Sequence, residues 1–225
     1  MRVSLLDRAL NILGRMTKAF IPRPRNLLII PHQMELSALE CVAVYGVDAY
    51  EIISGCGGLL AQHHARGGKS ILFLRSPAIE RDLEALAELG LDKESIHEWS
   101  DESRQKVPED VVFFYPFPPG RSEVEMMKTM DNKHRLRSYF YESRFLMLPD
   151  NELRIDEVYD AKLRAMAVLK PEKDPQFSHV LAIYRSAATG KGAGWYESYL
   201  SFGVADSVIS HNTRLGDVYD GSCIP

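Results

Sequence analysis

Short apolar runs alternate with helical patterns along most of this chain. The runs are four or five residues long and cover 27–30, 70–74 and 111–115. Runs of this length without polar alternation are typical of strands that are buried on both faces of a parallel sheet. Apolar residues recur at helical spacing in 59–65, 79–89, 123–137 and 156–169. The alternation predicts an α/β protein, a Rossmann-like three-layer α/β/α domain with a mostly parallel sheet.

The segment from 26 to 76 has the order of a βαβ unit. It contains in turn an apolar strand, a stretch of helical spacing, a glycine-rich run, a helix and a second strand, at 27–30, 34–45, 55–58, 59–65 and 70–74. Ligands of an open parallel sheet bind beyond the carboxyl ends of its strands. The residue just past the first predicted strand is therefore a candidate for chemistry, and that residue is His32.

The sequence is consistent with one main domain, because the 225 residues show no repeat and no low-complexity linker. We place this domain at 26–203, after a basic amphipathic helix with a proline linker at 1–25 and before an irregular tail at 204–225. Two interpretations of residues 1–20 stay open. In the first, the helix packs on the domain; in the second, its basic residues contact anionic lipid while its leucines enter the membrane surface.

Composition excludes several classes of function. A net charge of -4 argues against nucleic acid as the general partner. Three cysteines without a CxxC pair suit a reducing compartment, and no apolar run reaches the roughly 18 residues of a membrane span. We therefore expect a cytoplasmic protein, with membrane association only under the second interpretation of residues 1–20. Fingerprints for nucleotide cofactors and for a serine nucleophile elbow are absent from the sequence.

Two pairs of residues could carry chemistry, one of a histidine with a carboxylate and one of two carboxylates. His32 and Glu35 stand three residues apart, so a turn would let both face one metal ion. Asp48 and Glu51 repeat this spacing with two carboxylates. Taken alone, His32 is better explained as a hydrogen-bonded loop histidine.

The run Gly-Cys-Gly-Gly at 55–58 also has two interpretations. Placed at the start of a helix, its free N–H groups would favour an anion, which makes Gly57 and Gly58 candidates for substrate binding. Alternatively, the glycines only let the helix approach the sheet closely.

The order of these parts resembles the PIG-L/LmbE family of zinc-dependent N-acetylglucosaminyl deacetylases. In that family an apolar strand ends in Pro-His-Pro-Asp-Asp-Glu and is followed closely by Gly-Cys-Gly-Gly-Leu, a helix and a strand. Here the corresponding parts are 29–32, 55–61 and 71–74, and weaker resemblance continues through 84–91, 110–113, 141–142, 155–163 and 184–199.

The resemblance implies a zinc ion held by His32, with Glu35 in the place of the metal-binding aspartate. If about a dozen residues are inserted instead, Asp48 and Glu51 are what remains of the acidic part, and we assign the catalytic role to them. The family's second metal motif should fall near 118–125, a segment with no histidine. We assign Arg121 of that segment to substrate binding with Gly57 and Gly58.

Two functions follow as expectations. The first is a deacetylase-like hydrolase that removes an N-acetyl group from an amino sugar or its conjugate through metal-activated water. The second is a family member that has lost catalysis and binds a sugar or a partner. The altered residues in the metal motifs are the reason to keep the second.

Overall fold

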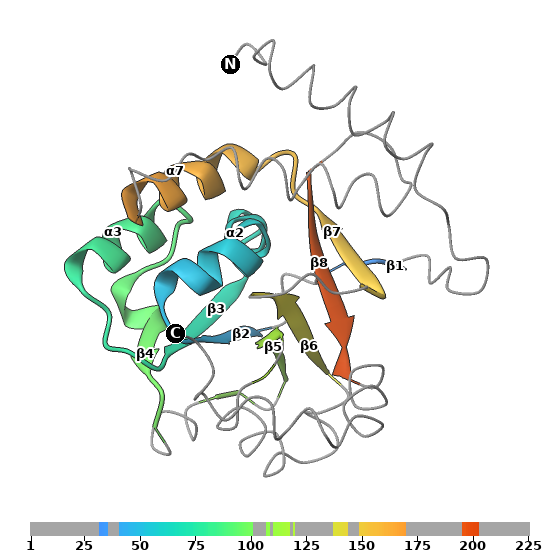
Figure 1. The fold of residues 1–225 in the computed structure, drawn as a ribbon, viewed down its shortest axis with the longest axis horizontal. Helices are drawn as coiled ribbons and strands as arrows, with labels where there is room; N and C mark the ends of the chain where they lie inside the picture. The colour runs from blue at the N-terminus through green and yellow to red at the C-terminus, as the bar shows by residue number, and fades with distance from the viewer. Residues whose placement is uncertain are drawn as a thin grey trace, which may run out of the picture.

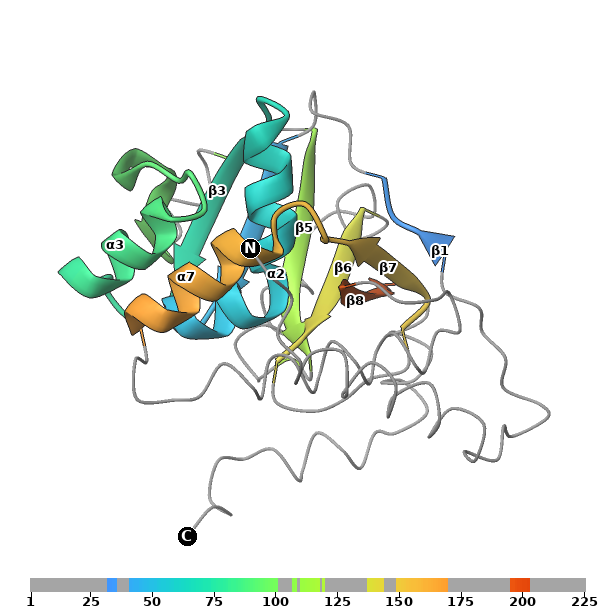
Figure 2. The ribbon, with the colours of Figure 1, turned by 90° about the horizontal axis from the view of Figure 1, so that it is seen from above.

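The structure is a computed structural model, and it describes residues 32–35, 41–100, 107–108, 110–117, 119, 137–143, 149–169 and 195–202. Figures 1 and 2 show one sheet with helices packed along it. The strands are β1 (His32–Gln33), β2 (Cys41–Gly46), β3 (Lys69–Leu74), β4 (Ile96–Glu98), β5 (Val111–Phe117), β6 (Ser138–Glu142), β7 (Asn151–Arg154) and β8 (Tyr196–Ser201). The helices are α2 (Ala49–Ala65), α3 (Glu80–Ala87) and α7 (Tyr159–Leu169), with a short 3-10 turn at Lys93–Ser95.

The sheet has the strand order β1-β7-β8-β6-β5-β2-β3-β4. Neighbouring strands run parallel throughout, except that β8 is antiparallel to both β6 and β7. From β2 the chain passes through β3 and β4 to one edge and then returns to β5 on the other side of β2. The carboxyl ends of β2 and β5 therefore flank the point where the strand order reverses, which is where open α/β sheets bind ligands. The prediction of an α/β fold with a mostly parallel sheet is confirmed.

Side chains on both faces of the central strands are buried. On β2, Val42 and Val44 pack into the cluster that includes the three helices, whereas Ala43 and Tyr45 pack into an aromatic cluster on the opposite face. All four are at most 3% exposed. This burial explains why the strand is apolar at nearly every position.

The strand that enters the βαβ unit differs from the sequence prediction. It is β2 at 41–46, so the helical spacing predicted over 34–45 is wrong for the residues of β2. The predicted strand 27–30 lies outside the described residues. A strand that is buried on both faces has apolar residues at nearly every position, and such a run fits a helical pattern as easily as an extended one.

Helix α2 is longer than predicted and is not straight. It begins after Asp48 and runs through the glycine run 55–58, which was expected to precede the helix. Figures 1 and 2 show that the ribbon of α2 changes direction sharply part-way along its length. A Cβ atom on Gly55 would lie 2.1 Å from Cδ2 of Tyr141, and one on Gly58 would lie 2.6 Å from Cγ2 of Ile155. The glycines therefore allow close packing, as the second interpretation of the run holds.

Other predicted elements agree with the structure. The helical patterns over 79–89 and 156–169 correspond to α3 and α7, and the runs 70–74 and 111–115 correspond to β3 and β5. Gly90 has a φ of +83°, a conformation that favours glycine, just beyond the end of α3. Within the described segments, no helix combines the length and apolarity needed to cross a bilayer.

We expect Gly55→Ala to destabilise the protein far more than Gly57→Ala. The added methyl on Gly55 would meet a fully buried ring and, at 2.8 Å, the carbonyl oxygen of Glu142. Overpacking of this kind costs about 1–3 kcal/mol or more. At Gly57 the nearest atoms are 3.2 Å away in the side chains of Ile53 and Lys162. There the contact is milder, and alanine gains up to about 1 kcal/mol of helix propensity.

Urea denaturation of the two variants and the wild type measures this difference. Equal losses of unfolding free energy in both variants would contradict the role of Gly55 in close packing.

Candidate functional site

The carboxyl end of β2 leads directly into α2 through Asp48. This residue is the N-cap of the helix, with extended backbone angles (φ −146°, ψ 172°). Its Oδ1 atom accepts a hydrogen bond of 2.8 Å from the N–H of Glu51, as is typical of an aspartate at this position. The residue is exposed, and among the described residues its Oδ2 atom has no hydrogen-bond donor. Asp48 thus presents one carboxylate oxygen outward at the point where the strand order reverses.

Glu51 joins the carboxyl ends of β2 and β6. Its Oε2 atom accepts a hydrogen bond of 2.8 Å from the N–H of Val47. Its Oε1 atom accepts a hydrogen bond from the hydroxyl of Ser143, which directly follows β6. Because β5 lies between β2 and β6, this contact spans the end of a third strand. The two donors fix the orientation of the carboxylate, and each oxygen keeps a further lone pair for another partner.

The structure brings Asp48 and Glu51 together but places His32 and Glu35 elsewhere. His32 belongs to the edge strand β1, five positions from β2 in the strand order, and both His32 and Glu35 are exposed. With about 4.8 Å between neighbouring strands, the two pairs are separated by more than roughly 20 Å. The four residues therefore do not form one site. The acidic pair that follows the helix-entering strand is Asp48 with Glu51.

The glycines assigned to substrate binding are buried inside the protein. The N–H of Gly58 donates a hydrogen bond of 2.7 Å to Oε1 of Glu197 on β8. Gly57 packs against side chains of Ile53 and Lys162. The anion bound at this run is thus a carboxylate of the protein itself, and direct substrate contact by either glycine stays only a prediction. Arg121 lies outside the described residues.

The described residues do not complete a zinc centre. Within them, no group of three or more histidine, cysteine, aspartate or glutamate side chains is arranged so that it could hold a metal ion. A catalytic zinc takes three protein ligands and a water molecule, whereas this edge of the described sheet offers the two carboxylates of Asp48 and Glu51.

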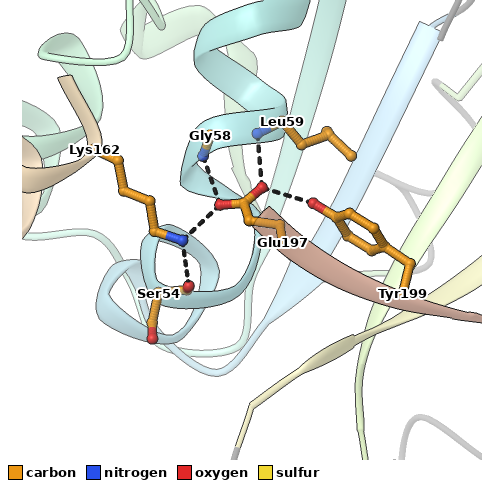
Figure 3. Close-up of polar contacts among 6 residues, drawn as sticks. All are labelled: Ser54, Gly58, Leu59, Lys162, Glu197 and Tyr199. Carbon is orange, nitrogen blue, oxygen red and sulfur yellow. Dashed lines mark hydrogen bonds and ion pairs between the residues drawn. The ribbon is translucent and has the colours of Figure 1, made fainter. Parts of the chain in front are cut away.

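A buried polar network surrounds Glu197 (Figure 3). The Glu197 carboxylate accepts hydrogen bonds from the N–H groups of Gly58 (2.7 Å) and Leu59 (2.8 Å) and from the hydroxyl of Tyr199 (2.7 Å). It also forms an ion pair of 2.6 Å with Nζ of Lys162. The Glu197 side chain is 0% exposed and that of Lys162 is 5% exposed. Four donors satisfy the four lone-pair positions of the carboxylate, which makes its burial tolerable.

The same network explains why α2 bends. Lys162 donates a second hydrogen bond of 2.7 Å to the carbonyl oxygen of Ser54, which lies just before the glycine run. A charged group thus contacts backbone carbonyl and amide groups inside the helix, where they normally face only each other. Sharp kinks occur at Ser/Gly pairs and where side chains enter the helical hydrogen-bond ladder. Ser54-Gly55 together with Lys162 and Glu197 provide both causes.

Sequence reasoning overlooked Ser143, Lys162 and Glu197. Lys162 lies on the buried stripe of α7 with Tyr159 and Ala165, so a charge in an apolar stripe was the available signal. Glu197 is likewise a charge within a buried strand. Neither signal reveals the partner, because Lys162 and Glu197 are brought together only by the fold.

The pKa of Tyr199 is raised in this network. Burial first, and then the neighbouring charge of Glu197, raise the pKa of Tyr199 well above its ordinary value near 10. The folded protein therefore keeps this proton at a pH at which the unfolded chain releases it.

This difference predicts that Tyr199 contributes to alkaline unfolding. Above about pH 10 the unfolded state binds fewer protons than the folded state, so the free energy of unfolding falls as pH rises. Tyr199→Phe should make this fall shallower by up to about 1.4 kcal/mol per pH unit. Chemical denaturation at several values between pH 8 and 11 measures the slope. Identical slopes above pH 10 for the variant and the wild type would show that Tyr199 does not contribute.

Comparison with known proteins supports the fold. No protein-family model matches the sequence, and no curated protein matches it. The structure is similar to the crystal structure of the conserved protein TT1542 from Thermus thermophilus, with a TM-score of 0.54, 17% identity, and coverage of 72% of this chain and 94% of that chain. It is also similar to GalB, the 4-carboxy-2-hydroxymuconate hydratase from Pseudomonas putida, with a TM-score of 0.50, 13% identity, and coverage of 72% and 95% respectively.

A third similar structure is the N,N'-diacetylchitobiose deacetylase from Pyrococcus horikoshii in complex with its inhibitor MPG. The TM-score is 0.50 at 14% identity, and the match covers 96% of this chain and 99% of that chain. The resemblance found in the sequence is thus supported at the level of the fold. Since a hydratase and a deacetylase share this architecture, activity must be argued from the site. This chain has the α/β fold that these three structures share.

Proposed function

We propose that this chain is a deacetylase-type hydrolase that removes an N-acetyl group from an amino sugar or its conjugate. The observation that carries the proposal is the exposed carboxylate of Asp48 at the carboxyl end of β2, beside the reversal of strand order. Ligands of open α/β sheets bind in this crevice. The fold shared with a chitobiose deacetylase supports the choice of an N-acetylated amino sugar over other amides.

In this proposal Asp48 is the proton acceptor. Hydrolysis adds the oxygen of water to the acetyl carbonyl carbon, breaks the C–N bond, and yields acetate and a free amine. Oδ2 of Asp48 takes a proton from the attacking water and returns it to the leaving nitrogen. Glu51 has a positioning role in this proposal, because its hydrogen bonds with Val47 and Ser143 hold the start of α2 against the sheet.

Zinc remains part of the proposal only through the family resemblance. Because Asp48 is the proton acceptor in this proposal, Glu51 is the residue of the pair that could supply an oxygen ligand, and further ligands would have to come from residues outside those described. Because the family's second metal motif should fall near 118–125, Glu123 and Glu125 are candidates for oxygen ligands, and His134 is a more distant candidate.

Asp48→Asn should lower acetate release from N-acetylglucosamine derivatives by roughly 100-fold or more, because it removes the proton acceptor. Asparagine is as good an N-cap as aspartate, so the helix start and the free energy of unfolding should be preserved. Asp160→Asn, an exposed change of the same chemistry in the first turn of α7, is the matched control and should leave turnover unchanged. Acetate is measured enzymatically, with the zinc content of each protein determined in parallel.

The outcomes separate the two placements of the site. Loss of turnover in Asp48→Asn with full activity in His32→Asn supports the site at β2. Loss in His32→Asn alone would move the site to the sheet edge. No acetate release by the wild-type protein, with or without added zinc, would reject hydrolysis.

A second candidate function is a non-catalytic sugar-binding protein. In the family pattern the general base stands two residues after the metal-binding histidine and one before the metal-binding aspartate. If Asp48 and Glu51 occupy the two ligand positions, Tyr50 occupies the base position, and a phenol does not replace a carboxylate there. Saturable binding of N-acetylglucosamine by calorimetry without any turnover would favour this candidate.

We also propose that residues 1–20 contact anionic membranes, because the segment 1–25 carries six basic residues against a single acidic one. The full-length protein should co-sediment with vesicles containing phosphatidylserine, and less so with neutral vesicles or at high salt. A form that starts at Asn26 is the control. Equal sedimentation of both forms would remove the membrane proposal.

A further inference from the structure

The bend in α2 separates the part of the helix that carries the acidic pair from the part that packs along the sheet. We propose that Lys162 and Glu197 are positioning residues, which set the direction of the first part of α2 and thereby place Asp48 at the carboxyl end of β2. This inference rests on the proposed function, because it assigns the two residues a task in the same site.

The contacts of the pair fall on the two sides of the bend. Lys162 binds the carbonyl oxygen of Ser54, at the end of the first part, at 2.7 Å. Glu197 binds the N–H groups of Gly58 and Leu59, at the beginning of the second part, at 2.7 and 2.8 Å. A cation at the carbonyl end of one helical part and an anion at the amide end of the next match the sign of each helix dipole. The ion pair thus caps both parts at once.

Burial makes this double cap stiff. The two side chains are 5% and 0% exposed, so water and salt screen their attraction little. Tyr199, two residues further along the same strand, adds a hydrogen bond of 2.7 Å to the carboxylate. The bend angle is therefore coupled to the position of β8 and α7, which carry Glu197 and Lys162.

Geometry turns a small change of the bend into a displacement of the site. The first part, from Ala49 to Ser54, has a length of roughly 9 Å at 1.5 Å per residue. A rotation of about 10° at the bend would move its far end by roughly 1.5 Å. In an active site a misplacement of about 1 Å costs on the order of 100-fold in rate. The hydrogen bond between Ser143 and Glu51 holds the first part of α2 near its N-terminal end. Together with the contact of Lys162 to Ser54, it determines the position of Asp48.

Glu197→Gln and Lys162→Met test this inference. The glutamine amide has one acceptor oxygen and one donor nitrogen, so it cannot accept from both backbone N–H groups. Methionine keeps the length of the lysine stem but removes the ammonium group. We expect amide exchange in a peptide covering 47–57 to rise by roughly tenfold or more relative to a peptide of α3. We also expect kcat to fall between roughly 10- and 100-fold with little change in KM.

Leu86→Ala is the matched control. Leu86 is a fully buried residue of α3, so its truncation weakens the fold without removing a hydrogen bond or ion pair at the bend. At a temperature where every variant is folded, this control should retain its kcat, and its amide exchange should rise first in α3. Uniform increases of exchange along all helices in Glu197→Gln would mean that the pair only stabilises the fold, and would overturn the inference.

The double variant Glu197→Gln/Lys162→Met separates stability from positioning. It removes the lone buried ammonium left by the single change, so its denaturation midpoint should recover toward that of the wild type. Exchange in 47–57 should stay high and kcat should stay low, and recovery of both with the midpoint would overturn the inference. If the wild-type protein releases no acetate, the proposed function fails. The exchange measurements alone then decide whether the pair sets the bend.

Discussion

Burying a carboxylate without hydrogen-bond donors is costly, so the fully buried Glu197 draws donors from the elements around it. Backbone N–H groups of α2 reach it only because the helix bends at Ser54-Gly55 and approaches β8 closely. Lys162 reaches it from α7 and in turn binds the carbonyl side of the bend. One ion pair and its hydrogen bonds thereby fix β8, α2 and α7 relative to one another. Removing one partner of such a pair typically costs about 3–5 kcal/mol, because the other charge stays buried.

The sequence predicted the class of fold because its buried strands and amphipathic helices have clear patterns. Strand β3 and helix α3 were found from these patterns. Strand β2 was missed because a strand buried on both faces shows no period that excludes a helix. The glycine run was placed before the helix for a related reason: glycine in a helix interior is locally unfavourable, and only tertiary packing against Tyr141 and Ile155 makes it fit.

The candidate site could be predicted only in part. Asp48 and Glu51 were found from their spacing, since residues three apart at a helix start interact locally. His32 was given to the same site because it follows an apolar run, yet strand order separates it from Asp48 by five positions. Strand order depends on long-range pairing, which no local pattern encodes. Ser143 and Glu197 were missed for the same reason, since their contacts to α2 join residues that are 92 and more than 130 positions apart in the sequence.

The antiparallel strand β8 gives the molecule a folding order. Its glutamate lies 139 residues after the amide of Gly58 that it binds. Contacts between such distant parts of a chain form late, since closing so large a loop costs entropy before any contact compensates for it. During synthesis the ribosome releases α2 long before β8 exists, so the nascent helix must await its internal cap. The acidic loop consequently acquires its final geometry only when β8, near the end of the domain, has emerged.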